Sequence, residues 1–238
     1  MWDGLVALLG RNDFLYIADS KLCSRAAMGH IAGRGGRFIT VLPRSRAEDG
    51  AFGDWLQTHT PDWTQAARRG EPEQVYSTTP APLPSAEGYR ITWIHSTAKS
   101  ARDGATRSDR IEAGIAAVEA LDAKLAGPRS RYKTRVAVEH AASAALAQAH
   151  AARWVTATVT QTTAKTYKQA RRGRPGPETS YREITTNRFA LAADIDLDHV
   201  AYDAASDGCF PLHAEPRVMP YPIRTPSEQA VITALGAA

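Results

Sequence analysis

The chain has 238 residues, a formal net charge of +4 at pH 7 and a pI of about 9.2. Hydrophobic residues make up 43% and charged residues 23% of it, which is ordinary for a globular protein with one large domain or two small ones. No apolar run reaches the roughly 20 residues of a membrane span, no signal peptide is expected, and two lone cysteines indicate neither a disulfide scaffold nor a zinc knuckle. We therefore expect a cytoplasmic protein, whose mildly basic charge permits contact with nucleic acid.

The first 45 residues carry a strand–helix–strand pattern. Residues 14–19 form a short apolar run that ends in Asp19 and is typical of a buried strand. Helical spacing follows over residues 21–34, with Ser20 as a candidate cap and a run of glycines at the end. A second strand is predicted over residues 38–42. This order favours a parallel sheet with a crossover helix.

Asp19 is the candidate functional residue of this segment. Functional groups of open α/β sheets collect at the carboxyl ends of strands, and Asp19 directly follows a predicted strand. The alternative interpretation is that Asp19 helps Ser20 to cap the next helix. Its position alone leaves both interpretations open.

The middle of the chain is predicted to contain a helical hairpin. Residues 44–88 are polar and rich in proline, so an irregular segment is expected there. Residues 89–96 alternate like a half-buried strand. Apolar side chains line one face of an amphipathic helix over residues 107–125. Gly127-Pro128 breaks this helix, and the Ala-rich residues 133–152 are expected to form the returning one.

The last part of the chain combines strands with a basic segment. Val and Thr alternate over residues 154–161, which predicts a strand, and a further strand is expected within residues 187–203. Residues 165–178 between them are basic and rich in Gly and Pro, and we expect a loop. The candidate DNA-contacting residues of this loop are Lys165, Lys168, Arg171, Arg172 and Arg174.

Within this loop, Arg172-Gly173-Arg174-Pro175 matches the short core of an AT-hook. Flexible Arg-Gly-Arg segments of that kind can enter a narrow minor groove of DNA. The alternative is a solvated basic loop without a nucleic-acid partner, and a match of this length leaves that alternative open.

Four other chemistries are not indicated. The glycines at 33–36 close a helix and open a strand, the reverse of the order in a phosphate loop. The acidic run 194–198 lacks the glycine and the bidentate acid of a calcium loop, because His199 and Ala205 stand at those positions. No two histidines lie four residues apart, and no Gly-x-Ser-x-Gly motif occurs. The pattern therefore favours neither a nucleotide-binding nor a hydrolase site.

The run FLYIADSKLCSRAAMGHIAGRGGRFITVLPRSRAED, which begins at Phe14, resembles the region around the second catalytic Asp of insertion-sequence DDE transposases. The similarity is to the class whose catalytic core is interrupted by a large insertion. Later blocks that fit the same group are residues 88–93, the loop 172–176 with Thr179 and Tyr181 after it, and residues 207–212. The resemblance covers about residues 1 to 212 and is most specific in the first 45.

This resemblance implies an α/β fold, in which a partial ribonuclease-H-like (integrase-like) core is interrupted by a large α+β insertion domain. Residues 1–45 would belong to the core, residues 46–206 to the insertion, and residues 207–238 to a return segment with an unrelated tail. Asp19 matches the second acid of the DDE triad, and so is expected to be catalytic and to bind metal. The pattern stops after Leu212, and Glu228 lies in a capping box with no catalytic role expected.

In the intact family enzyme, three carboxylates would hold two Mg²⁺ or Mn²⁺ ions about 4 Å apart for phosphoryl transfer. One Asp is not enough for this, so we expect a transposase fragment, truncated at both ends and inactive alone. Its expected partner is DNA, at transposon ends and target, and a homo-oligomer is left open. The alternatives are a catalytically dead DNA-binding or dimerising fragment, and a product that does not fold stably because sheet edge is exposed.

Overall fold

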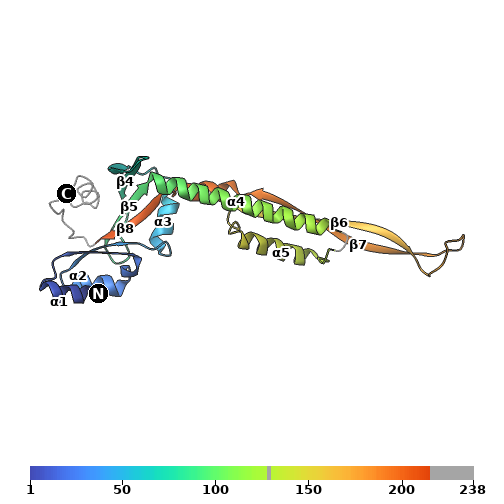
Figure 1. Cartoon of the computed structure of the whole chain (residues 1–238), viewed down its shortest axis with the longest axis horizontal. Helices are drawn as coiled ribbons and strands as arrows, with labels where there is room; N and C mark the ends of the chain where they lie inside the picture. The colour runs from blue at the N-terminus through green and yellow to red at the C-terminus, as the bar shows by residue number, and fades with distance from the viewer. Residues whose placement is uncertain (128–129, 215–238) are drawn as a thin grey trace. The chain divides into compact units, whose positions relative to one another are not determined.

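The computed structural model describes residues 1–127 and 130–214 of the chain (Figure 1). The chain divides into two compact units. Unit 1 consists of Met1–Ala105 and the described part of Tyr202–Ala238, and unit 2 consists of Thr106–Ala201. The limits expected for the insertion, residues 46–206, rest on the family resemblance and stay a prediction. The expectations for Glu228 and the rest of the tail lie outside the described residues.

Unit 1 is built on a mixed sheet of six strands in the order β1-β2-β8-β5-β4-β3. The neighbours β1 and β2 run parallel, and the other neighbouring strands run antiparallel. These strands are β1 Leu15–Ala18, β2 Arg37–Val41, β3 Thr64–Arg69, β4 Gln74–Pro80, β5 Arg90–Ser96 and β8 Cys209–Ala214. The helices that accompany them are α1 Trp2–Leu9, the 3-10 helix η1 Ser20–Leu22, α2 Arg25–Gly33 and α3 Ala47–Leu56. The predicted α/β class is confirmed, while a ribonuclease-H-like core stays a prediction.

The predicted strand–helix–strand unit at the N-terminus is confirmed, with a different start for its helix. The chain leaves β1 through η1, and α2 begins at Arg25. Ser24 caps α2, because its hydroxyl accepts a hydrogen bond from the amide of Ala27 at 3.2 Å. The parallel pairing places Tyr16 opposite Phe38. The crossover therefore consists of a tight 3-10 turn and a helix, not of one helix from Lys21.

The prediction that residues 44–88 are irregular is wrong, because α3, β3 and β4 lie within them. The hydrophobic signal is weak in β3, where Ala67 is the single buried side chain. Prolines do not interrupt the strands: Pro72 lies in the turn between β3 and β4, and Pro80 is the last residue of β4. At strand ends and turns, proline removes no hydrogen bond that the ladder needs.

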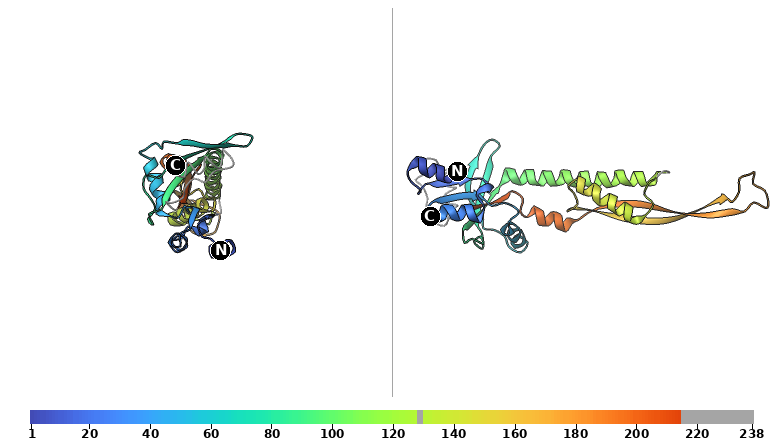
Figure 2. Two further views of the ribbon diagram at one scale, coloured as in Figure 1. Left: turned by 90° about the vertical axis from the view of Figure 1, so that its left-hand side faces the viewer. Right: turned by 90° about the horizontal axis from the view of Figure 1, so that it is seen from below.

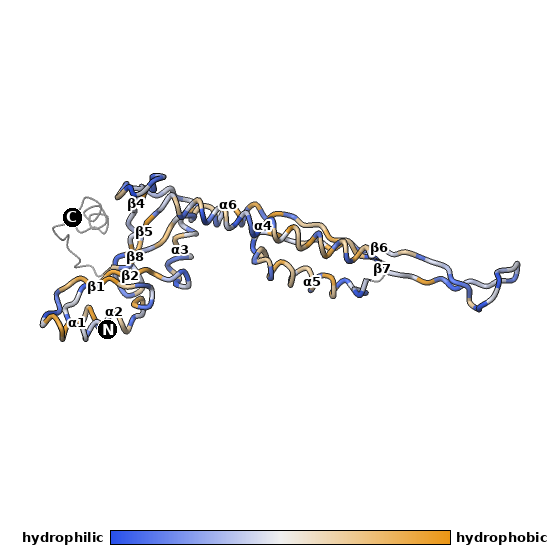
Figure 3. The backbone as a smooth tube through the Cα atoms, in the orientation of Figure 1, coloured by the Kyte–Doolittle hydropathy of each residue, from blue (hydrophilic) through white to orange (hydrophobic). Residues whose placement is uncertain are grey.

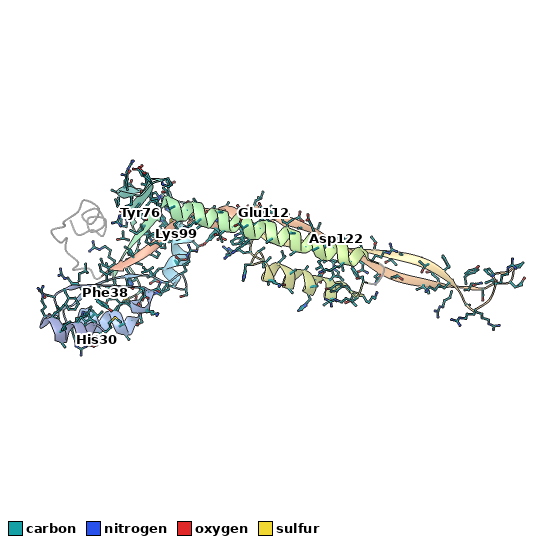
Figure 4. The ribbon with its side chains drawn as sticks, in the orientation of Figure 1. His30, Phe38, Tyr76, Lys99, Glu112 and Asp122 are labelled. Atoms are coloured by element: carbon teal, nitrogen blue, oxygen red, sulfur yellow. The ribbon has the colours of Figure 1, made fainter. Side chains whose placement is uncertain are left out.

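In the core of unit 1, side chains from the helices pack against side chains from the strands. Phe38 of β2 is fully buried, and Figure 4 labels it between the sheet and the helices. The ring of Phe52 in α3 stacks on Trp93 of β5, with the ring centroids 3.8 Å apart. Trp2 of α1 and Met28 of α2 belong to the same buried cluster. This cluster fixes β1 and β2, and so fixes the position of Asp19.

Unit 2 consists of two helices against a long hairpin. The helices are α4 Thr97–Ala126, which enters unit 2 at Thr106, and α5 Arg135–Gln148, so both predicted helices are confirmed. Pro128 of the predicted break lies outside the described residues. The strands β6 Val155–Gln169 and β7 Tyr181–Ile195 form a two-stranded antiparallel ribbon, and the helix α6 Leu197–Ala204 follows. The carboxylate of Asp122 on α4, labelled in Figure 4, accepts a hydrogen bond from the amide of Leu191 in β7 at 2.7 Å.

The ribbon is buried at one end only. Val155, Val159 and Phe189 pack into the cores of unit 2, whereas none of residues 160–188 is buried. The part of the ribbon beyond these residues extends past α4 and α5 in Figures 1 and 2 and is mainly hydrophilic in Figure 3. We call residues 162–188 the distal ribbon. Among the described residues, no helix is both long and apolar enough to cross a membrane.

Candidate functional site

Asp19 lies at the carboxyl end of β1, where the sequence places it. Its backbone is extended, and its carboxylate caps η1 by accepting a hydrogen bond from the amide of Lys21 at 3.0 Å. Its carbonyl oxygen accepts a hydrogen bond from the hydroxyl of the buried Thr40 in β2 at 2.6 Å. The side chain is exposed. Asp19 therefore caps the helix that follows it and still exposes its carboxylate to solvent, so a structural and a functional role are compatible.

A groove of about 720 Å³ runs beside Asp19 and is lined in part by Tyr16, Lys21 and His30. Asp3 also lines it, but His30 Nε2 lies 2.8 Å from its carboxylate and lowers the pKa of that group. Among the residues that the structure describes, no three His, Cys, Asp or Glu side chains gather as a metal-binding group. Two Mg²⁺ or Mn²⁺ ions need several oxygen ligands, and the described residues do not supply that set.

The prediction that residues 165–178 form a loop is wrong for its first part, because β6 continues to Gln169 and Lys165 and Lys168 are therefore strand residues. The five predicted DNA-contacting residues all lie in the distal ribbon, but they do not share one face. Thr162 pairs with Arg188 and Lys168 pairs with Arg182 across the ribbon. Directly opposed residues of an antiparallel pair point to the same side, and successive residues alternate. Lys165 therefore points to the side opposite Lys168. The register divides the distal ribbon into two faces of different charge.

The basic face holds three cationic side chains and no acid. It consists of Thr162, Ala164, Thr166, Lys168, Arg182, Ile184, Thr186 and Arg188. The paired face consists of Thr163, Lys165, Tyr167, Gln169, Tyr181, Glu183, Thr185 and Asn187. On the paired face, the ammonium of Lys165 lies 2.9 Å from the carboxylate of Glu183, and the hydroxyl of Tyr167 donates to the same carboxylate at 3.1 Å. An external anion would meet the uncompensated charge on the basic face.

The tip of the ribbon, residues 170–180, joins the two faces. It carries Arg171, Arg172 and Arg174, which are exposed, together with one acid, Glu178. The amide of Ala170 donates to the carbonyl of Ser180 at 2.9 Å, which closes the tip. The hydroxyl of Thr179 accepts a hydrogen bond from the amide of Gly176 at 2.7 Å. Flexible cationic side chains at a ribbon end can reach phosphates on either side of a groove.

Arg182 and Arg188 belong to the basic face and were missed from the sequence. They lie after the loop, in a segment where Glu183 and Asn187 mask any basic run. They share a face because they lie six residues apart in β7, an even number, and the register places them opposite Lys168 and Thr162 of β6. A register of this kind is set by the hairpin as a whole and not by the local sequence.

A second polar cluster lies inside unit 1. The thiol of Cys23 is 3.5 Å from Nδ1 of His213, and both side chains are buried. Burial raises the pKa of Cys23 and lowers that of His213 to about 4. Nearby, Arg46 binds Glu48 and Glu87, each at 2.7 Å, and this guanidinium lowers the pKa of Glu48 to about 2. A neutral thiol beside a neutral imidazole is not an activated nucleophile, so this cluster contributes to the core.

Comparison with known proteins returned no match among protein-family models, curated proteins or solved structures. The interpretation of the chain therefore depends on its own residues and on the resemblance that its sequence carries.

Proposed function

We propose that this chain is a DNA-binding portion of an insertion-sequence DDE transposase, with a ribonuclease-H-like catalytic core and an insertion that holds the distal ribbon. The observation that carries the DNA-binding part is the charge of the distal ribbon, whose basic face carries three cations and no acid, and whose tip carries three arginines and one acid. The position of Asp19 after β1 in a parallel strand pair supports the assignment to the transposase class.

The intact enzyme would transfer phosphoryl groups at the ends of the element, and bound Mg²⁺ or Mn²⁺ would stabilise the charge that develops on the oxygens. In this chain, Asp19 would supply one carboxylate, which accepts a hydrogen bond from the amide of Lys21, while the hydroxyl of Thr40 holds the backbone carbonyl of Asp19. Two further carboxylates would have to come from outside the described residues. We therefore expect the chain alone to bind DNA without cutting it.

DNA binding is tested by fluorescence anisotropy with a labelled duplex at increasing salt. Neutralised phosphates release counterions, so affinity should fall steeply with salt, by a slope of about −0.9 for each phosphate contact. Changing Arg171, Arg172 and Arg174 to Ala should weaken binding and reduce that slope. The matched control changes Arg69, Arg102 and Arg110 to Ala, which removes the same charge outside the ribbon from exposed positions. Equal losses in both variants would contradict a role for the ribbon.

Cleavage is tested on supercoiled plasmid with Mg²⁺ or Mn²⁺, beside an Asp19→Ala variant. We expect no nicking by either protein. Nicking that the original chain performs and Asp19→Ala abolishes would show that further ligands assemble on Asp19, either from this chain or from a second copy.

A second candidate function is that of a catalytically dead fragment that binds DNA or dimerises. The lack of a three-ligand metal group among the described residues favours it. The two candidate functions can be distinguished by mixing the chain with a transposase of the same element. A fragment that only binds DNA would compete for the element's ends and inhibit transposition, whereas a portion of the enzyme would restore activity to a complementary portion.

A further inference from the structure

We propose that the basic face of the distal ribbon lies in the major groove of DNA and contacts base edges there, while the tip contacts phosphates. This inference rests on the proposed function, because it specifies how the same ribbon would hold DNA. It goes beyond it by assigning one face, one groove and two additional residues, Arg182 and Arg188, to recognition.

The dimensions of the ribbon fit that groove. Paired strands lie about 4.8 Å apart and rise about 3.4 Å per residue, so Thr162 to Lys168 span about 20 Å. The major groove of B-DNA is about 12 Å wide and admits a two-stranded ribbon, whereas the minor groove is about half as wide. The two strands of the distal ribbon pair only with each other, so no further strand is bonded to either long edge. Its thickness is therefore that of two strands and their side chains.

The two faces differ in what they could offer to DNA. The basic face places Arg188 near one end and Arg182 with Lys168 near the other. Between them lie the short side chains of Ala164, Thr166 and Thr186, together with the larger apolar side chain of Ile184. Arginine forks bind guanine O6 and N7, and threonine contacts bases through its hydroxyl and methyl groups. The paired face holds Glu183 and its two partners, and its carboxylate would face phosphates unfavourably.

The charge also varies along the basic side of the ribbon. Nearer the helices, the same side continues through Thr160, Thr158 and Thr156 to Asp194, which pairs with Thr156. The acid lies close to the body of unit 2, and the cations lie toward the tip. DNA in contact with this side would therefore be bound by the distal ribbon and not along its whole length.

The test uses two neighbouring threonines of β7. Thr186 lies on the basic face opposite Ala164, and Thr185 lies on the paired face opposite Lys165. Both are exposed, so Thr186→Glu and Thr185→Glu make the same chemical change on opposite faces. With a labelled mixed-sequence duplex, we expect Thr186→Glu to weaken binding about tenfold or more, and Thr185→Glu by less than about threefold. Arg182→Gln should weaken binding as well, and serves as the second variant if Thr186→Glu alters the ribbon's circular dichroism.

The groove is tested by competition with two groove-specific dyes. Methyl green, which occupies the major groove, should displace the original chain, and netropsin, which occupies the minor groove, should not. If the original chain does not bind the duplex at all, the proposed function fails. If it binds but both threonine variants lose affinity equally, or netropsin alone displaces it, DNA binding stands and the assignment of face and groove is overturned.

Discussion

His213 has no exposed surface, and burial holds its pKa at about 4. Its Nδ1 lies against the thiol of Cys23, and its Nε2 has no hydrogen-bond partner among the described residues. A neutral imidazole is the form that such an environment tolerates, because a buried charge without a partner is strongly unfavourable. His213 therefore makes the stability of unit 1 depend on pH.

The sign of that dependence follows from the two states. His213 titrates near 4 in the folded chain and near 6.5 when unfolded, so the unfolded state binds more protons between these values. The free energy of unfolding should fall as pH decreases through this range, by about 2 kcal/mol between pH 7 and pH 5. Urea unfolding followed by tryptophan fluorescence measures it. In His213→Gln the fall should be smaller, and an unchanged fall would show that other groups cause it.

At the scale of elements, the helices and strands that could be predicted from the sequence are mainly those with an apolar pattern. β1, β2, β5 and α4 bury hydrophobic side chains and were predicted from their apolar runs or spacing, whereas α5 was predicted from its Ala content. In contrast, β3 buries one side chain, and the distal ribbon alternates Thr, Lys and Tyr without an apolar face. Strands of this kind form because a neighbour supplies their hydrogen bonds. Asp19 was found because it follows a buried strand, while Arg182 and Arg188 depend on a register that local sequence does not reveal.

Gly114 allows α4 to pack closely against the residues that precede the ribbon. A Cβ atom at this position would lie 2.4 Å from the Cβ of Ala151 and 3.4 Å from a methyl of Val155. We expect Gly114→Ala to lower the free energy of unfolding by about 1–3 kcal/mol, because overpacking outweighs the gain in helix propensity of about 1 kcal/mol. The control is Gly50→Ala in α3, where the added Cβ meets nothing within 4 Å. That variant should be as stable as the original chain or more so, and a stable Gly114→Ala would refute the close contact.

At the scale of the whole molecule, the buried cores and the proposed DNA contact belong to different parts of the chain. The cores of both units are formed without the distal ribbon, since no residue from 160 to 188 is buried. The basic face and the tip belong entirely to that ribbon. A ribbon without a packed core has little stability of its own, and its amides should exchange with solvent faster than those of the proximal strands.

Replacing residues 163–187 with an Asn-Gly turn tests this separation. Asn-Gly favours the tight turn that joins two antiparallel strands. We expect the free energy of unfolding to change by less than about 1 kcal/mol, because all buried contacts remain, and DNA affinity to fall about tenfold or more. Circular dichroism during urea unfolding and fluorescence anisotropy provide the two measurements. A shortened chain that binds DNA as before would place the contact elsewhere.

The placement of the two thiols has a practical consequence. Cys23 and Cys209 both lie in unit 1, both are buried, and burial raises the pKa of each, that of Cys209 to about 11. Since the reactive species is the thiolate, an alkylating reagent modifies them only during excursions that open this unit. Unit 2 contains no cysteine, so opening of unit 2 does not contribute to the rate of alkylation. The rate at which these two thiols are alkylated therefore measures how often unit 1, which contains Asp19, opens, and no label has to be introduced.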